Sequence, residues 1–213
     1  MYNKIQKELD RAYYYIEQNN LFNWPTQSNR YDKISNFIYY TNDFKSLLEQ
    51  IQLYGLDESY IIHRWYNFHT SKTCEKIFCN LGAVEEIDKK NKYVDFYING
   101  IPFDLKVTVY PKKLKIQSTI YNLSKINDKN ELIKWFYMNQ SQEQRMHMRN
   151  RLFIVCNGEN NLRLKSNFDK IEVEIKNWLN TFINNPESHN ILNINDHNSN
   201  VHTVYSDIIE INN

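Results

Sequence analysis

The chain has 213 residues, of which 41% are hydrophobic and 15% are aromatic, so it can bury a substantial core. Its 26 Lys and Arg residues nearly balance 25 Asp and Glu residues, and the net charge of +1 excludes a protein that coats nucleic acid through its overall charge. No Walker-type lysine loop or dinucleotide fingerprint occurs among the few glycines, which argues against a nucleotide cofactor.

The location of the protein is indicated by what the sequence lacks. No stretch approaches the roughly 20 apolar residues that cross a bilayer, and the N-terminus has no signal-peptide pattern. Cys74, Cys79 and Cys156 form no disulfide framework, which suits a reducing compartment. We therefore expect a cytoplasmic protein without membrane contact.

Residues 1–56 are predicted to form an N-terminal helical layer, in the same domain as the rest or as a subdomain of it. Two stripes of apolar residues have helical spacing, and the second ends at Gly55. The segment with Trp24, Pro25 and Ser28 is expected to be a loop. The stripes are Ile5, Leu9, Ala12, Tyr13 and Ile16, followed by Phe44, Leu47, Leu48, Ile51 and Tyr54.

Residues 57–213 are predicted to form an α/β core, a central mixed sheet flanked by helices. Asp57 can cap a long helix that ends before Gly82. The expected elements after it are strands at 84–87, 92–98 and 101–109, a helix at 128–149, a strand at 152–155, a helix at 168–182 and a strand at 203–211.

The strongest local signal is Asn99-Gly100, a pair that favours a two-residue hairpin turn because it tolerates positive φ. This turn predicts a register in which Asp95 lies directly opposite Asp104, with Lys106 on the same face. The other face is apolar and must be buried. It carries Val94, Phe96, Ile98, Ile101, Phe103, Leu105 and Val107.

Two aspartates held opposite one another repel, and a divalent cation would offset that repulsion. Mg²⁺ prefers oxygen ligands and often takes only one or two protein carboxylates. A lysine beside such a site could orient the nucleophile and offset negative charge on a phosphate. The same three residues also suit the solvated face of an ordinary amphipathic hairpin, with Lys106 neutralising Asp104.

The chain resembles the PD-(D/E)xK nuclease superfamily in Val94-Asp95 followed by Asp104-Leu105-Lys106, and in the element order of residues 70–156. The resemblance implies a restriction-endonuclease-like core and Mg²⁺-dependent hydrolysis of phosphodiesters, with Mn²⁺ as a substitute. It makes Asp95 and Asp104 metal ligands and Lys106 the catalytic lysine. Valine stands before Asp95, where the family motif has proline.

Further site residues follow from the resemblance and from local charge. Many family members carry an acidic residue on the preceding helix, a position that Glu75 matches as a third catalytic metal ligand; a surface glutamate is the alternative. Gln140, Gln142, Gln144 and Arg145 are candidates for a polar residue on the later helix. The nucleic-acid-binding candidates are Lys112, Lys113, Lys115, Gln144, Arg145 and Arg149, and His147 and Arg151 belong to the same basic groups.

The sequence therefore predicts a metal-dependent deoxyribonuclease that acts on DNA. We expect an endonuclease of restriction or defence type, with a homodimer as one arrangement that would cut two strands. The alternative is a nucleic-acid-binding or assembly protein that keeps the nuclease fold without catalysis. A zinc site built from His63, His69, Cys74 and Cys79 is disfavoured, because on one helix these residues point in several directions.

Overall fold

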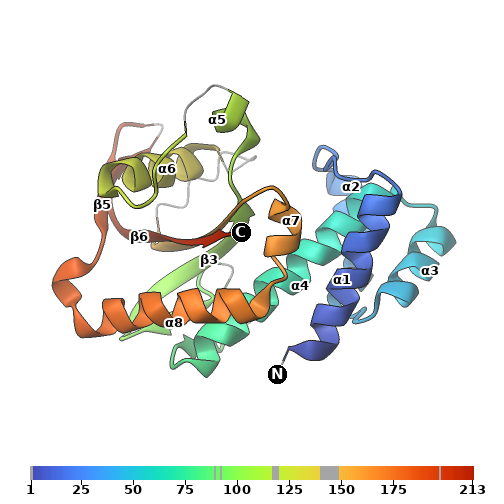
Figure 1. Cartoon of the computed structure of the whole chain (residues 1–213), viewed down its shortest axis with the longest axis horizontal. Coiled ribbons are helices and arrows are strands. Elements are labelled where there is room, and N and C mark those ends of the chain that lie inside the picture. The colour runs from blue at the N-terminus through green and yellow to red at the C-terminus, as the bar shows by residue number, and fades with distance from the viewer. Residues whose placement is uncertain (1, 89, 92, 117–119, 140–148, 197) are drawn as a thin grey trace.

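A computed structural model describes residues 2–88, 90–91, 93–116, 120–139, 149–196 and 198–213. Within these ranges the chain builds an α/β fold around a six-stranded sheet (Figure 1). The elements are α1 (Asn3–Gln18), α2 (Asn29–Ile34), η1 (Asn36–Tyr39), α3 (Phe44–Tyr54), α4 (Glu58–Asn80), β1 (Val84–Glu85), β2 (Phe96–Ile98), β3 (Ile101–Val109), α5 (Lys112–Ile116), α6 (Ile126–Asn139), β4 (Arg151–Asn157), α7 (Asn161–Leu164), α8 (Phe168–Asn184), η2 (Pro186–Ser188), β5 (Ile191–Asn195) and β6 (Val201–Asn212).

The sheet is mixed and open, with the strand order β1-β2-β3-β4-β6-β5. The first three strands are antiparallel neighbours, β4 is parallel to both β3 and β6, and β5 returns antiparallel to β6. Parallel pairs need crossover connections, which α6 supplies between β3 and β4 and α8 supplies between β4 and β6. Figure 1 shows α6 over one face of the sheet and α8 with α4 over the other.

Alternate residues of the central strand β4 face these two helical layers. Leu152, Ile154 and Cys156 join the core beneath α4 and α8, whereas Phe153 and Val155 join a separate core beneath α6. A strand buried on both faces reads as a continuous apolar run, which is why residues 152–155 are uniformly hydrophobic.

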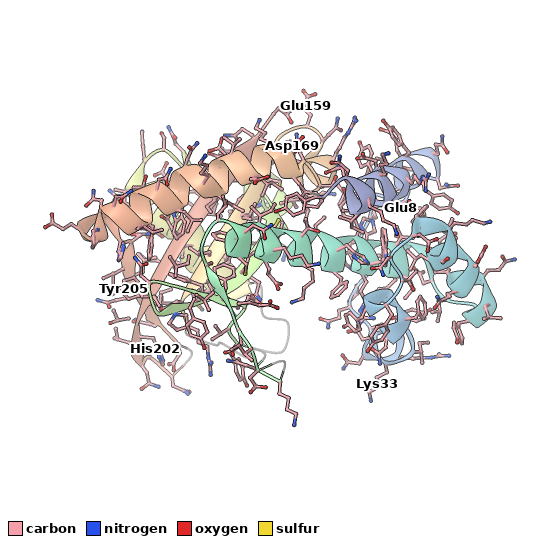
Figure 2. The ribbon with its side chains drawn as sticks, turned by 90° about the horizontal axis from the view of Figure 1, so that it is seen from below. Glu8, Lys33, Glu159, Asp169, His202 and Tyr205 are labelled. Carbon is pink, nitrogen blue, oxygen red and sulfur yellow. The ribbon has the colours of Figure 1, made fainter. Side chains whose placement is uncertain are left out.

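The N-terminal helices lie against the end of α4 that extends beyond the sheet (Figure 1). Figure 2 labels Glu8 on α1, whose Oε2 accepts the backbone N–H of Phe44 at 2.9 Å and so ties the start of α3 to α1. Leu9, Ile16 and Leu47 belong to the same buried cluster as the sheet residues that face α4 and α8. One continuous core therefore joins residues 1–56 to the remainder.

Most predicted elements are confirmed, and several of them differ in length from the prediction. The Asp57 carboxylate caps α4 by accepting the N–H of Tyr60 at 2.7 Å, and Gly55 ends α3 with φ of +58°. The strand predicted at 84–87 covers only two residues, and that predicted at 92–98 begins at Phe96. The helix predicted at 128–149 is present as α6, and its predicted continuation over 140–148 lies outside the described residues.

No helix in the ranges that the structure describes is long and apolar enough to cross a membrane.

Candidate active site

The hairpin turn forms as the sequence predicts. Asn99 and Gly100 have φ of +49° and +78°, which is the positive-φ conformation that a two-residue turn of this type requires. The register pairs Ile98 with Ile101, Tyr97 with Pro102 and Phe96 with Phe103. Up to Phe96, therefore, each residue lies opposite the partner predicted for it.

At Asp95 the chain departs from this ladder, so the predicted direct cross-strand pair with Asp104 is wrong in detail. In a regular ladder the N–H of Asp95 would point away from β3, yet it donates to the carbonyl of Phe103 at 2.8 Å. The Asp95 side chain reaches past Asp104, and its Oδ2 accepts the N–H of Leu105 at 2.7 Å. Val94 consequently lies beside Pro102 rather than in the predicted apolar face.

The departure occurs where β2 stops pairing with β3. Phe103 is the last β3 residue with a partner on β2, so the N–H of Leu105 faces an edge without a strand partner in the described chain. A buried N–H without a partner is costly, and the Asp95 carboxylate satisfies this one. Burial raises the pKa of Asp95, and the charge of Asp104 contributes to this rise as a smaller cause.

Asp104 is buried and holds two cations. Its Oδ1 accepts a hydrogen bond from Lys106 Nζ, and its Oδ2 accepts one from Arg151 Nε at 3.0 Å. Arg151 projects from the neighbouring strand β4, directly opposite Asp104 in the parallel register, and lies over the ring of Tyr137 at 5.1 Å. Arg151 therefore belongs to the interior, and its predicted place among exposed phosphate-contacting residues is wrong.

Glu75 lies on α4, is half-buried and pairs with Lys72. Its pKa is raised, first by burial and then by the charge of Asp95, while Lys72 and Lys106 lower it. Lys72 Nζ donates to Glu75 Oε2 at 2.5 Å. The charges of Asp95 and Lys106 thus act on Glu75, as expected if α4 turns this residue toward the end of β2 rather than fully into solvent.

The fit of a divalent cation depends on the oxygens that stay available. Among the described residues, no group of three or more His, Cys, Asp or Glu side chains is arranged to hold a metal ion. Both oxygens of Asp104 accept from Lys106 and Arg151, and Asp95 Oδ2 accepts from Leu105, so a cation would bind here through Asp95 Oδ1 and the remaining lone pairs of these oxygens. Burial raises the pKa of Asp95 and of Glu75. A pair of carboxylates completed by water suits Mg²⁺, which seldom takes an all-protein shell.

A cavity of about 830 Å³, the β3-edge cavity, opens beside Lys106 along the part of β3 that follows its pairing with β2. Its floor is β3 from Lys106 to Val109, and its walls come from α4, the loop before α2, and the segment that contains α7. Lys106 thus contacts both the carboxylate cluster and this cavity. The lining residues are Tyr13, Phe22, Asn23, Trp24, His63, Asn67, Lys106, Val107, Thr108, Val109, Lys112, Glu159, Asn160, Asn161, Leu162 and Lys165.

The structure separates the predicted nucleic-acid-binding residues. Lys112, at the start of α5, lines the β3-edge cavity together with Lys106. Lys115 lies over the ring of Tyr110 at 5.6 Å, and exposed Arg149 lies over the ring of Tyr93 at 3.8 Å. Lys113 is exposed outside the cavity lining. Gln144 and Arg145, like Gln140, Gln142 and His147, lie outside the described residues.

The sequence reasoning overlooked Lys165 and assigned no role to Asn67, although both line the β3-edge cavity. An isolated lysine before a helix carries no pattern that marks it as buried. Each histidine of the disfavoured zinc set lies against a backbone carbonyl: His63 Nε2 lies 2.7 Å from the Leu21 carbonyl, and His69 Nε2 lies 2.9 Å from the Thr41 carbonyl.

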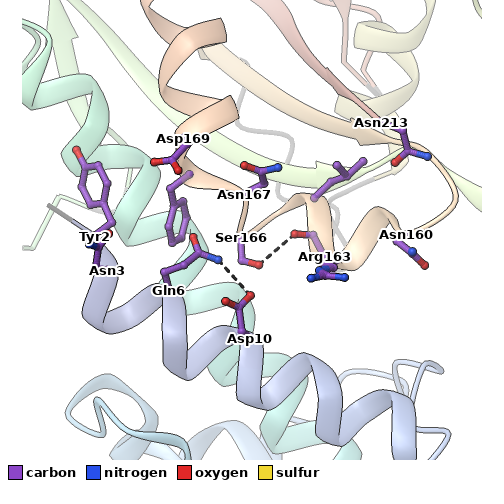
Figure 3. Close-up of a pocket in the computed structure, with 12 residues that line it drawn as sticks. Tyr2, Asn3, Gln6, Asp10, Asn160, Arg163, Ser166, Asn167, Asp169 and Asn213 are labelled. Atoms are coloured by element: carbon purple, nitrogen blue, oxygen red, sulfur yellow. Dashed lines mark hydrogen bonds between the residues drawn. The ribbon is translucent and has the colours of Figure 1, made fainter.

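A second cavity of about 440 Å³, the α1–α8 cavity, lies where α1 meets the segment from Asn160 to Asp169 (Figure 3). Its polar side chains bond to their own neighbours: Gln6 donates to Asp10 at 3.2 Å, and Ser166 donates to the Arg163 carbonyl at 3.1 Å, as Figure 3 shows. These contacts make it a seam between packed elements.

Comparisons of the chain with protein-family models, with curated proteins and with solved structures find no match.

Proposed function

We propose that the chain is a divalent-metal-dependent nuclease that hydrolyses phosphodiester bonds of DNA at the cluster of Glu75, Asp95, Asp104 and Lys106. The observation that carries this proposal is that Asp104 bonds to Lys106 where β2 leaves β3, with the Asp95 carboxylate held by the N–H of Leu105 beside it. The charge of Asp104 helps to raise the pKa of Asp95, and the charge of Asp95 helps to raise that of Glu75. The resemblance of Asp95 and Asp104-Leu105-Lys106 to the PD-(D/E)xK pattern points to the same chemistry.

The proposed roles follow from the contacts. Lys106 bonds to Asp104 on one side and borders the β3-edge cavity on the other, so it can place its ammonium group against a phosphate that enters the cavity. Arg151 holds the second oxygen of Asp104 and fixes the orientation of this carboxylate. Asp95 is fixed in turn by the N–H of Leu105.

Asp95 and Asp104, with Glu75 nearby, would hold Mg²⁺ or Mn²⁺. Such an ion supplies Lewis-acid activation of the phosphate and a bound water of lowered pKa. Lys106 offsets the negative charge that develops on the phosphate oxygens, and Lys112 provides a further positive charge in the cavity wall. An endonuclease of restriction or defence type, working as a homodimer, stays a prediction from the resemblance.

Cleavage of circular and linear DNA by purified protein tests the proposal. We expect cutting with Mg²⁺ or Mn²⁺ and none with chelator, and Lys106→Ala should slow cutting by roughly 10² to 10³-fold, as the loss of one charge-stabilising donor does elsewhere. Lys45→Ala is the matched control, because Lys45 is 88% exposed and pairs only with Glu49 at 3.8 Å among the described residues. Equal cutting by wild type and Lys106→Ala would contradict the assignment.

A second candidate function has one observation in its favour: both oxygens of Asp104 already bind protein cations, Lys106 and Arg151. In a nucleic-acid-binding protein without catalysis, this network would serve only to fix β3 against β4. That candidate predicts retention of DNA without cutting under any metal, and no binding of Mn²⁺ in a calorimetric titration.

A further inference from the structure

The β3-edge cavity contains a buried lysine. Lys165 is 4% exposed, and its Nζ donates to Asn67 Oδ1. In the described part of the chain, no carboxylate lies within ion-pair distance of it. Burial lowers the pKa of Lys165 from its ordinary 10.5 to about 8. A buried ammonium without a counter-charge is expensive, so an anionic ligand would stabilise it.

Two further polar atoms of residues that line this cavity lack partners among the residues that the structure describes. His63 is 3% exposed, and Nδ1 of its ring is buried without a hydrogen bond. Since Nε2 of His63 lies 2.7 Å from a carbonyl, it must be the protonated nitrogen, which leaves Nδ1 as an acceptor in the neutral ring. Asn67 Nδ2 is likewise a buried donor without a partner. Buried polar atoms are nearly always paired, so these two call for a ligand.

The cavity also offers aromatic surface. Trp24 and Phe22 line it while 51% and 42% exposed. Trp24 stacks on His63, with ring centroids 5.4 Å apart and planes 23° from parallel, so it is positioned by a buried residue and keeps its other face available. An exposed aromatic face of this kind is what nucleobases stack on.

The charge of the lining is one-sided. Among the described lining residues, Lys106, Lys112 and Lys165 are cationic, and Glu159 alone is acidic and exposed at the rim. Figure 2 shows Glu159 at the edge of the molecule. A volume of about 830 Å³ exceeds what a single phosphate fills and lies within the range of pockets for small organic ligands.

We propose that the β3-edge cavity binds one unpaired nucleotide, with its phosphate at Lys165 and Asn67 and its base against Trp24. The His63 ring, on which Trp24 stacks, would hold this indole in position against the base. This inference rests on the proposed nuclease, because it makes the nucleotide part of the strand whose backbone passes Lys106. The substrate class is therefore DNA with an unpaired nucleotide, such as a single strand or a frayed end, rather than an uninterrupted duplex.

Calorimetric titrations in chelator, where no cutting occurs, test this binding. The probes are a deoxynucleoside 5′-monophosphate, the deoxynucleoside without phosphate, inorganic phosphate, a single-stranded tetranucleotide and a blunt hairpin duplex. We expect the monophosphate and the tetranucleotide to bind more tightly than the other three. Near pH 8.5 their binding should take up protons, because an anion beside Lys165 raises its pKa, and this uptake appears as a dependence of the binding enthalpy on the buffer.

Variants divide the site into its parts. Lys165→Met should weaken monophosphate binding by at least tenfold and abolish the proton uptake, and Trp24→Ala should weaken binding by about tenfold through lost stacking. Trp24 is half exposed, so its variant keeps the test valid should Lys165→Met not fold. Lys134→Met is the control, because Lys134 lies on α6 and pairs with Glu131 at 2.8 Å.

The outcomes separate this inference from the proposed function. Nucleotide binding in a protein that never cuts DNA keeps the site and contradicts the nuclease, whereas cutting without nucleotide binding contradicts the site alone. Inorganic phosphate binding as tightly as the monophosphate would overturn the base pocket. Binding of the free monophosphate without the tetranucleotide, or of the duplex in preference to both, would overturn the assignment to an unpaired strand.

Discussion

The α1–α8 cavity and the β3-edge cavity differ in how their polar groups are satisfied. In the α1–α8 cavity, Gln6 bonds to Asp10 and Ser166 bonds to the Arg163 carbonyl. In the β3-edge cavity, Lys165 is buried without a carboxylate among the described residues, and His63 Nδ1 and Asn67 Nδ2 have no partner at all. Groups that satisfy one another need no ligand, whereas unsatisfied buried groups are maintained against a cost in stability.

The largest effect on stability should come from Asp104, which bonds to Lys106 of the β3-edge cavity. Asp104→Ala leaves Arg151 buried without a counter-charge, so we expect the free energy of unfolding to fall by roughly 3 to 5 kcal/mol. Urea denaturation measures it. Asp10→Ala in the α1–α8 cavity is the control and should stay within about 0.5 kcal/mol of wild type; equal losses at both positions would remove the contrast between the cavities.

Lys165 should make stability depend on pH in an unusual direction. Its pKa is about 8 in the folded protein and near 10.5 when unfolded, so between these values the unfolded chain binds more protons. Stability contributed by this residue therefore rises as pH rises through that window, by up to about 3 kcal/mol. The measurement is the difference in unfolding free energy between wild type and Lys165→Met from pH 7 to 10.5, which cancels the other titrating groups. A difference that does not change with pH would contradict the unpaired state of Lys165.

A smaller effect on stability is expected at Asp95, together with a large loss of function. Burial raises the pKa of Asp95 above 3.8, so its contribution to stability declines as pH rises through the folded pKa and is unfavourable at neutral pH. Asp95→Asn can still accept the Leu105 N–H through its amide oxygen. We expect the free energy of unfolding of Asp95→Asn at pH 7 to equal or exceed that of wild type, and DNA cutting to be lost. Marked destabilisation would indicate a structural carboxylate instead.

The smallest effect is predicted for Gln6→Ala, which removes a hydrogen bond from the α1–α8 cavity. The bond to Asp10 is partly exposed, so the free energy of unfolding, measured by thermal denaturation, should fall by no more than about 0.5 kcal/mol. DNA cutting and nucleotide binding should be unchanged. Weaker nucleotide binding by Gln6→Ala would indicate that the nucleotide binds in the α1–α8 cavity, and would contradict its assignment to the β3-edge cavity.

The sequence was sufficient for the elements whose patterns are local. Asn99-Gly100 predicted the turn and the register as far as Phe96, and the apolar run at 152–155 predicted the central strand. The sequence did not predict the displacement of Asp95. The Asp95 carboxylate accepts the N–H of Leu105, which lacks a strand partner in the described chain because β2 leaves β3 after Phe103. The strand β5 was not predicted, because its few apolar residues lie among asparagines and show only a short alternation.

The candidate site was predictable in residue type and only partly in partners. Asp95, Asp104, Lys106 and Glu75 follow from spacing and resemblance, whereas the pairing of Asp104 with Arg151 depends on a parallel register between strands 47 positions apart. Lys165 and Asn67 are 98 positions apart and meet through tertiary packing alone. Single-sequence patterns do not record such contacts.

The most direct test of the central claim is a calorimetric titration with Mn²⁺ of wild type, Asp95→Asn and Asp10→Asn at neutral pH without DNA. The account predicts saturable binding by wild type and by Asp10→Asn, which lies in the α1–α8 cavity, and at least tenfold weaker binding by Asp95→Asn. Indistinguishable binding by all three proteins, or none by wild type, would contradict a metal site where β2 leaves β3.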